Sequence, residues 1–410
     1  MKKHHIVADA LSPYVARRAG ARGCERAPCR LRLGVLGLTA ALAMVASADV
    51  AAQTATETQS AANDANLDSV TVKGQALRGA NAPFSVENFG AEDIRDQKVK
   101  SAQDLFRLVP GMNVRNYSLS GVADAMVLRG FGGGGHGGDL GAVIDGIPLN
   151  EAMSHADGYV DFNVVVPLEI ANLAVYKGPV SALYGNFNRS GLVAIETRKE
   201  GSYKNVDVSL ASHSTLDAQA ALGAPLTDGQ QLNLAAQVFH TDGFRPQSGF
   251  DRQTASARWS IALTPTMQLA VAGRFFHGEG DSASYLPKTQ FDVDPYGIDA
   301  RVQNDGSKKN FDTLRSDFAW RLTPDLKLLA FVYGTKQDFT RWYTRPVSTT
   351  TWAQREESYD RRVAGAGVNL NGQLKVGAGP LNWVAGIETF RESTDYWFYD
   401  NLDHRQRTST

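Results

Sequence analysis

The sequence has 410 residues, of which 43% are hydrophobic and 21% are charged, with a formal net charge of −1 at pH 7. This length allows two or three ordinary domains, and the average composition is that of a globular protein. It does not exclude a membrane barrel, whose strands alternate lipid-facing and lumen-facing residues. Cys24 and Cys29 both lie near the N-terminus, so the rest of the sequence has neither a disulfide nor a cysteine metal site.

The first 48 residues have the order of a secretory signal peptide. Eight Lys and Arg precede the apolar run Leu33–Val45, and the small residues Ala46–Ala48 fit a cleavage site. The apolar run is too short for a transmembrane helix. These residues hold 8 of the 42 Lys and Arg and 2 of the 43 Asp and Glu, which leaves 34 basic and 41 acidic residues. Export is therefore predicted, and nucleic acid is not expected as a partner.

Residues 49–83 are predicted to be a flexible tether with one short strand. Gln53–Asn66 contains too few large apolar residues to offset the entropy of an ordered chain. The strand comprises Asp68, Ser69, Val70, Thr71 and Val72. Such a strand can pair with the edge of a partner's sheet, or it can be the first strand of the folded domain, and the pattern alone favours neither.

Residues 84–200 are predicted to form a small α+β domain. A helix begins at the capping motif Ser101–Asp104 and ends at Pro110-Gly111. Asp145-Gly146 follows two apolar residues and is a hairpin signal. Further strands are predicted at Asn113–Arg115, Ala125–Arg129, Ile170–Tyr176 and Val193–Thr197.

Two loops of this domain carry candidate ligand contacts. The glycine-rich segment Phe131–Leu140 lacks the Gly-Lys-Ser/Thr ending of a phosphate-binding loop, so nucleotide binding is not expected. His136 and Asp139 in this loop, with His155 and Asp157 in the next, either contact a ligand or are ordinary solvated residues. Their spacing matches no standard metal site, and no metal is predicted.

Residues 201–410 have the pattern of a membrane barrel wall. Apolar Leu232, Leu234, Ala236 and Val238 alternate with more polar neighbours, as lipid-facing strands require. Short turns are predicted at Leu226–Gly229, Leu263–Thr266 and Leu322–Asp325, and long loops at His240–Thr254, His277–Asn310 and Thr340–Glu357. Aromatic girdles at the membrane surface are predicted at Phe275-Phe276, Phe339–Tyr343 and Tyr396–Tyr399.

We expect about nine strands between Asn205 and Asp400. A plugged transporter barrel has about 22. Nine strands would leave two sheet edges unpaired in hydrocarbon, which is not viable. The sequence is therefore interpreted as a fragment, either a truncated product or a partial sequence.

The small domain resembles the plug domain of the TonB-dependent outer-membrane receptors. The resemblance depends on Leu108–Gly111, Leu128–Gly130, Asp145–Pro148 and Lys177–Pro179, followed by Ala182–Gly185, in this order. It implies an α+β plug followed by an antiparallel transmembrane β-barrel. In one departure, Ser190 stands where the family usually has the first of two glycines.

The resemblance also implies roles for particular residues. The strand Asp68–Val72 corresponds to the box that binds TonB. The plug motif and gating residues are Arg129, Gly130, Asp145, Gly146, Pro148, Gly178, Pro179, Tyr184, Gly185, Gly191 and Arg198. Arg129, Asp145 and Arg198 are candidates for ion pairs or are ordinary surface charges, and the glycines are expected to hold turns.

The predicted function is TonB-energised import of a scarce ligand across the outer membrane of a Gram-negative bacterium. The expected partners are TonB with its inner-membrane complex, outer-membrane lipid and a small ligand. An iron–siderophore complex is the default ligand, and cobalamin, another metal chelate and an oligosaccharide are alternatives. A non-transporting remnant and a ligand sensor are also open, although residues 49–66 are short for a signalling domain. We expect no cofactor and no enzymatic activity.

Overall fold

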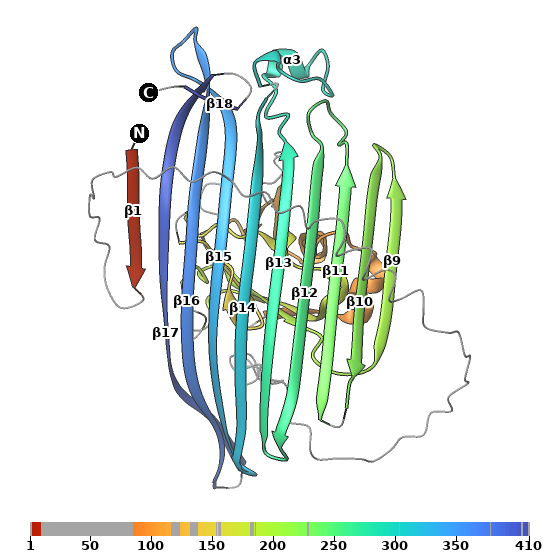
Figure 1. The fold of residues 1–410 in the computed structure, drawn as a ribbon, viewed down its shortest axis with the longest axis vertical. Helices are drawn as coiled ribbons and strands as arrows, with labels where there is room; N and C mark the ends of the chain where they lie inside the picture. The colour runs from red at the N-terminus through yellow and green to blue at the C-terminus, as the bar shows by residue number, and fades with distance from the viewer. Residues whose placement is uncertain are drawn as a thin grey trace. The chain divides into compact units, whose positions relative to one another are not determined.

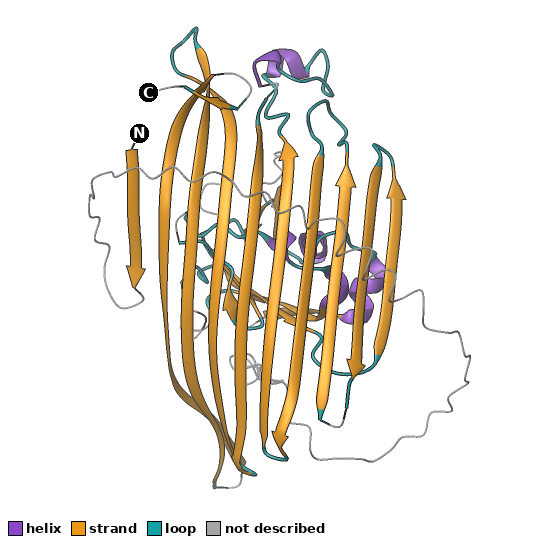
Figure 2. Ribbon diagram, in the orientation of Figure 1, coloured by secondary structure: helices purple, strands orange, loops and turns teal. Residues whose placement is uncertain are grey.

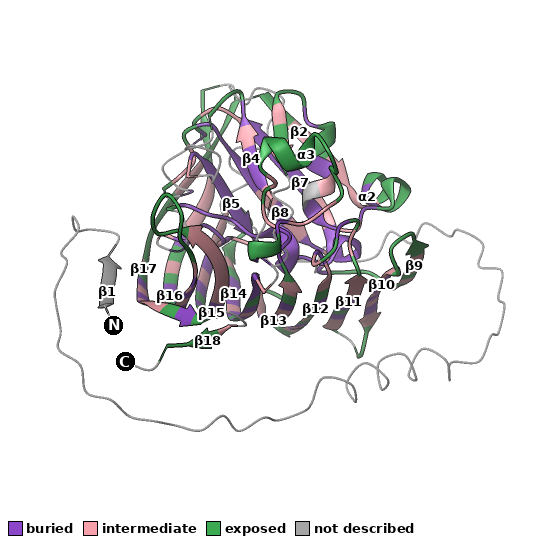
Figure 3. Ribbon diagram, turned by 90° about the horizontal axis from the view of Figure 1, so that it is seen from above, coloured by how far each residue is buried: buried purple, intermediate pink, exposed green. Residues whose placement is uncertain are grey.

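The computed structural model describes residues 2–9, 85–115, 124–131, 138–152, 154, 157–180, 184, 186–227, 229–302, 304–377, 379–402 and 405–408. In this part of the chain a small α+β domain lies against one face of a large antiparallel sheet (Figures 1 and 3). The predicted fold class is confirmed. None of the helices within these ranges has the length and apolar character needed to cross a membrane.

The small domain is built on a five-stranded sheet with the order β2-β7-β8-β5-β6, in which only β5 and β8 are parallel. Its elements are β2 (Ser85–Gly90), α2 (Ala91–Gln97), η2 (Ala102–Leu108), β3 (Met112–Arg115), β4 (Ala125–Leu128), β5 (Leu140–Ile144), β6 (Ile147–Pro148), η4 (Phe162–Val164), η5 (Pro167–Glu169), β7 (Ile170–Lys177) and β8 (Gly191–Thr197). Strands β3 and β4 form a separate pair.

The helix predicted after Ser101 is present as the 3-10 helix η2. The backbone N–H of Ser101 donates to the Asp104 carboxylate at 3.0 Å, as in a capping box. Leu105 and Phe106 of this helix are fully buried. The Phe106 ring meets Phe162 edge-on at 5.0 Å between centroids, and this contact joins η2 to η4 in the domain core.

The large sheet is a meander of nine strands, β9 to β17, in which each strand pairs with the next. The strands are β9 (Tyr203–Ala211), β10 (Thr215–Pro225), β11 (Gln230–Thr241), β12 (Phe250–Thr264), β13 (Met267–Asp281), β14 (Gly306–Thr323), β15 (Leu326–Pro346), β16 (Trp352–Val376) and β17 (Gly379–Leu402). The short strand β18 (Gln406–Arg407) pairs with β17. The connection between β13 and β14 contains the helices α3 (Lys288–Phe291) and η7 (Ala300–Val302), and α3 lies at the upper rim in Figure 2.

Strand β1 (Lys2–Asp9) pairs with β17 on the side away from β16. It is the only part of the predicted leader, residues 1–48, within the described ranges. The apolar run, the cleavage site, the tether 49–83 and the strand Asp68–Val72 lie outside them. The export signal and the docking strand therefore stay predictions.

The predicted short turns lie together at one rim of the sheet, with the longer connections at the opposite rim (Figure 1). Two of the predicted long loops are wrong in extent. Nearly half of His240–Thr254 and most of Thr340–Glu357 are strand, and the connections there cover only residues 242–249 and 347–351. Both segments are polar on each face, which hid their strand character in the sequence.

The two faces of the large sheet differ in polarity. Leu210 and Ile387 point outward and are 80% and 72% exposed, whereas Arg315 and Asp317 point toward the small domain and are 3% exposed. This inversion of the usual soluble pattern fits a wall that faces lipid outside and a polar lumen inside. The predicted aromatic girdles are partly wrong. Aromatic residues in all three segments, Phe276, Phe339 and Tyr396, are buried on the inner face instead.

Candidate functional site

The hairpin turn between β5 and β6 places Asp145 at the contact of the small domain with the large sheet. Asp145 and Gly146 have φ of 47° and 82°, as a two-residue hairpin turn requires. The Asp145 carboxylate accepts hydrogen bonds from the Thr197 N–H at 3.1 Å and hydroxyl at 2.7 Å, and pairs with Lys199 at 3.2 Å. Burial would raise the pKa of Asp145, but Lys199, Thr197 and Arg258 together hold it well below its usual value.

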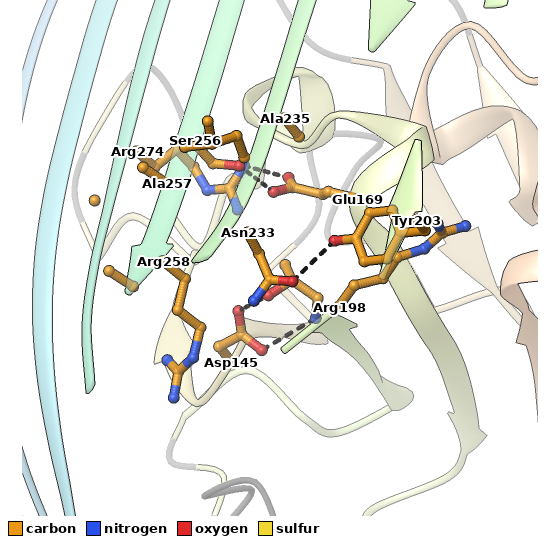
Figure 4. A pocket seen from close by; sticks show the side chains of 14 residues that line it. Asp145, Glu169, Arg198, Tyr203, Asn233, Ala235, Ser256, Ala257, Arg258 and Arg274 are labelled. Atoms are coloured by element: carbon orange, nitrogen blue, oxygen red, sulfur yellow. Dashed lines mark hydrogen bonds and ion pairs between the residues drawn. The ribbon is translucent and has the colours of Figure 1, made fainter. Parts of the chain in front are cut away.

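Arg198 lies beside this turn but does not pair with Asp145. Its guanidinium donates to the Asn205 side chain at 2.6 Å and stacks 4.6 Å from the Tyr203 ring centroid. Its backbone N–H donates to the Glu169 carbonyl at 2.8 Å. Burial lowers the pKa of the Arg198 guanidinium from its usual value. Arg198 therefore connects the end of the small domain to β9 (Figure 4).

Arg129 and Gly130 form the turn that ends β4, with φ of 53° and 80°. The Arg129 side chain is exposed and makes no ion pair within the described ranges, so the structure does not join it to Asp145 or Arg198. Gly178 also has positive φ, 104°, and its N–H donates to the Ser190 carbonyl at 2.7 Å. These residues shape turns, as expected for the glycines.

The remaining motif residues pack the small domain. Pro148 ends β6, Pro179 follows β7 and is exposed, and Tyr184 is buried in an apolar cluster with Tyr176. Gly191 begins β8 where a Cβ atom would lie 2.2 Å from the Tyr176 carbonyl oxygen. Gly185 lies outside the described residues.

The four candidate ligand contacts differ in their surroundings. Asp139 is buried and forms an ion pair with Arg189. Its carbonyl oxygen accepts hydrogen bonds from the N–H and hydroxyl of Ser190, each at 2.8 Å, which explains the serine that departs from the family pattern. Asp157 is exposed, in a loop that touches the one containing Asp139. His136 and His155 lie outside the described residues.

Glu151 was not identified from the sequence, yet it is a fully buried charge at the interface, 1% exposed. Its carboxylate pairs with Lys309 of β14 at 3.1 Å and accepts hydrogen bonds from Gln337 and Tyr359, each at 2.8 Å. Burial would raise the pKa of Glu151, but Lys309, Arg361 and these hydrogen bonds lower it to about 2. Its partners are at least 158 positions away, so no local signal could have identified it.

A second buried pair extends this network along the sheet. Arg361 of β16 bonds Glu392 of β17 at 2.7 Å, and its guanidinium also donates to the Asn150 carbonyl at 3.1 Å. Glu392 in turn accepts from the Ala152 N–H at 3.2 Å. Backbone groups on either side of Glu151 are therefore fixed to two adjacent strands.

Strands β10 to β13 hold the other side of the small domain. Gln237 and Arg252 donate to the Lys100 carbonyl at 2.8 and 2.6 Å. Glu169 forms an ion pair with Arg274, and it accepts from the Ser256 hydroxyl at 2.5 Å. The interface is therefore joined by polar side chains on both sides.

A small cavity lies between the two domains near Asp145 (Figure 4). It has about 40 Å³ of space for water-sized molecules, and its lining includes Glu169, Arg198, Asn233 and Arg258. At about 10–15 Å³ for each water, a few waters fill it. A siderophore-sized ligand does not fit this cavity. Within the described ranges no group of three or more His, Cys, Asp or Glu residues is placed to hold a metal ion.

Comparisons with known proteins agree with this architecture. Residues 78–192 match the family model of the TonB-dependent receptor plug domain. The vitamin B12 transporter BtuB of Vibrio vulnificus (strain CMCP6) is 27% identical over 237 residues, which cover 55% of this chain and 37% of that protein. The ferric enterobactin receptor PirA of Pseudomonas aeruginosa is 28% identical over 192 residues, or 43% of this chain and 26% of PirA.

Among solved structures, the unliganded ferric citrate transporter FecA has a TM-score of 0.68 at 14% sequence identity. The match covers 79% of this chain and 50% of FecA. At this identity the likeness shows the fold alone. The chain spans about a third of the length of the curated relatives it matches.

These matches confirm the resemblance drawn from the motifs. Residues 78–192 match the plug domain of the TonB-dependent receptors, and the described chain shares the fold of about half of FecA. Below, the small domain is called the plug and the sheet β9 to β17 the barrel sheet.

Proposed function

We propose that this chain is part of an outer-membrane receptor that imports a small ligand with energy delivered through TonB. The observation that carries the proposal is the plug itself, which sits against the polar inner face of the barrel sheet through buried ion pairs such as Glu151–Lys309. The exposed apolar outer face supports a membrane location. The proposal involves no enzymatic step.

The proposed ligand is an iron–siderophore complex. PirA and FecA, which resemble this chain, are named as receptors for iron chelates, whereas BtuB is named for vitamin B12. Cobalamin and other metal chelates are therefore the alternatives to test alongside iron. The proposed ligand contacts are His136, Asp139, His155 and Asp157, of which Asp157 is exposed and Asp139 forms an ion pair with Arg189.

The strand Asp68–Val72 is proposed to pair with TonB. Deletion of Leu67–Gly74 from the complete receptor should abolish uptake of the ferric chelate while the receptor still binds it at the cell surface, because binding precedes the energised step. Uptake of radiolabelled iron by a strain without other receptors measures the first effect, and binding to energy-depleted cells measures the second.

A matched control is deletion of Thr54–Ala61, which removes the same number of residues from the tether and should leave uptake intact. Normal uptake after loss of Leu67–Gly74 would contradict the docking role. Uptake of labelled cobalamin instead of iron would change the assigned ligand but keep the transport function.

A further inference from the structure

One buried side chain of the plug connects the two loops that carry the proposed ligand contacts. Asn150 lies two residues after β6 and is 7% exposed. Its amide oxygen accepts a hydrogen bond from the Ala142 N–H at 2.8 Å. Its amide nitrogen donates to the carbonyl oxygens of Leu140 and Gly158, each at 3.0 Å. Both donors of the amide are therefore used, together with one acceptor.

This set of contacts explains why the residue is an asparagine. One N–H group must meet an acceptor and two carbonyl oxygens must meet donors, so the amide can lie in only one orientation. An ionised aspartate has no donor, a serine has a single hydroxyl donor, and a glutamine carries its amide one methylene further away. Because a buried carbonyl without a donor is costly, each of these residues would disturb the backbone around Asn150.

The two carbonyl groups that the amide binds lie next to proposed ligand contacts. Leu140 directly follows Asp139 of the glycine-rich loop, and Gly158 directly follows Asp157 of the next loop. Neither partner is close to the other in the sequence. The Asn150 amide therefore sets the spacing between the backbone that carries Asp139 and the backbone that carries Asp157.

A direct contact between the same two loops leaves no space between them. A Cβ atom at Gly138 would lie 2.8 Å from the Asp157 carbonyl oxygen, and one at Gly158 would lie 2.5 Å from the Gly138 Cα atom. Both glycines also have positive φ, 91° and 77°. Glycine backbones can approach this closely because they have no side chain. The loops thus meet backbone to backbone, with the amide as the polar connection.

Asn150 is at the same time fixed to the barrel sheet. Its own carbonyl oxygen accepts a hydrogen bond from the Arg361 guanidinium at 3.1 Å. Arg361 in turn bonds Glu392 at 2.7 Å, and the Glu392 carboxylate accepts from the Ala152 N–H at 3.2 Å. The amide therefore holds the two loops in a defined place against β16 and β17, and does not only hold them to each other.

We propose that Asn150 is a positioning residue of the ligand site, which holds the two loops at the spacing that an iron chelate requires. This inference rests on the proposed function. Without the amide the loops adopt other arrangements as well. A ligand then binds more weakly in proportion to the smaller population of the competent arrangement. Affinity is lost in this way although no group that touches the ligand has been removed.

The test measures binding of ferric enterobactin, ferric citrate and cobalamin, for which relatives of the chain are named, to the purified protein in dodecyl maltoside. Quenching of tryptophan fluorescence reports binding. Asn150→Ser should weaken binding of the compound that the native protein binds by about tenfold, the change in population that loss of a strong hydrogen bond produces. Hydrogen–deuterium exchange should become faster in residues 138–142 and 157–160, but not in β7.

Asn150→Gln separates position from stability. It keeps both donors and the acceptor but moves them by one methylene. We expect its urea midpoint to fall less than that of Asn150→Ser, while binding is still about tenfold weaker. Binding at the native level by Asn150→Gln would overturn the proposal, because spacing would then not matter.

The matched control is Asn163→Ser. Asn163 is a plug residue buried to a similar degree, but its side chain accepts from Arg252 of the barrel sheet at 2.5 Å. Its loss should lower the urea midpoint and leave binding unchanged. An equal loss of binding in the control would overturn the positioning role, as would unchanged binding by Asn150→Ser. Those results contradict this inference alone, whereas a native protein that binds none of the three compounds contradicts the proposed function and the inference with it.

Discussion

The sheets of the plug and of the barrel differ in how many charged side chains they bury. In the plug sheet, Leu173 of β7 and Ile195 of β8 are buried in an apolar core. In the barrel sheet, Lys309 and Arg315 of β14 are buried while Leu314 between them is exposed. The plug sheet is packed in a hydrophobic core, as in a soluble domain. The inner face of the barrel sheet adds a few apolar side chains to that core, such as Phe276, Phe311 and Phe331, and its other contacts to the plug are polar.

This difference concentrates buried charge at the interface between the two domains. A buried ion pair adds little net stability compared with apolar packing, but removal of one partner is costly because it leaves an uncompensated charge. Such an interface favours the one arrangement of the two domains in which each buried charge meets its partner. Exposing its polar side chains to water would cost less than exposing an interface of interlocked apolar side chains.

The largest expected effect comes from Lys309. Its ammonium contacts the carboxylates of Glu151 at 3.1 Å and Asp161 at 3.2 Å, and the side chain is 2% exposed. Lys309→Met keeps the side-chain length but leaves two buried carboxylates without their cation. We expect the free energy of unfolding of the protein to fall by about 3–5 kcal/mol, measured from its urea midpoint.

Lys308→Met is the matched control for this prediction. Lys308 is the preceding residue, faces outward and, among the described residues, forms one exposed ion pair, with Glu279 at 3.4 Å. Its loss should change the midpoint little. If both substitutions had equal effects, the distinction between the inner and outer faces of the barrel sheet would be wrong.

The second expected effect is a loss of stability in acid. We assign it to the interface between the plug and the barrel sheet, and not to the plug core. The pKa of Glu151 is lowered from 4.5 to about 2, so its ionised form stabilises the folded state. This stability is complete above about pH 4.5 and is lost as the pH falls toward 2. A shift of this size corresponds to about 3 kcal/mol. Asp145 is shifted in the same direction and adds to the loss.

Urea midpoints measured at pH 7, 4 and 3 check this prediction. Glu151→Gln should flatten the decline in acid, because its amide does not titrate. Glu92→Gln, on the exposed surface of helix α2, should leave the decline unchanged. If the urea midpoint of the Glu151 variant fell in acid as much as that of the native protein, another group would cause the pH dependence.

Features of the fold that depend on neighbouring residues were predictable from the sequence. The turn at Asp145-Gly146, the capping motif at Ser101 and the alternation of the barrel strands all follow from contacts within a few positions. The plug motifs could be recognised because their order and spacing lie within one stretch. The strand-like polar segments were missed because a strand that is polar on both faces has no alternation to detect.

The interface itself could not be predicted in the same way. Glu151 meets Lys309 and Gln337 only after the sheet has formed, 158 and 186 positions along the chain. The direction of an aromatic side chain depends on register, so Phe339 and Tyr396 were expected at the membrane surface but lie inside. Arg129 has the same charge as Arg361, yet only Arg361 is buried in the interface.

The smallest expected effect is the difference between the same substitution, glycine to alanine, in the plug sheet and in the barrel sheet. A Cβ atom at Gly191 of plug strand β8 would lie 2.2 Å from the Tyr176 carbonyl oxygen and 2.6 Å from the Leu128 side chain. Backbone must shift to admit it, so Gly191→Ala should lower the free energy of unfolding by about 1–3 kcal/mol.

At Gly273 of barrel strand β13 the nearest atom is 3.7 Å away, an ordinary contact. Gly273→Ala should therefore be neutral or slightly stabilising, since alanine has less freedom to lose on folding. Urea midpoints of the two variants measure the difference. A loss at Gly273 equal to that at Gly191 would mean that the barrel sheet is packed as tightly as the plug. The polar contacts would then not be the main constraint at the interface.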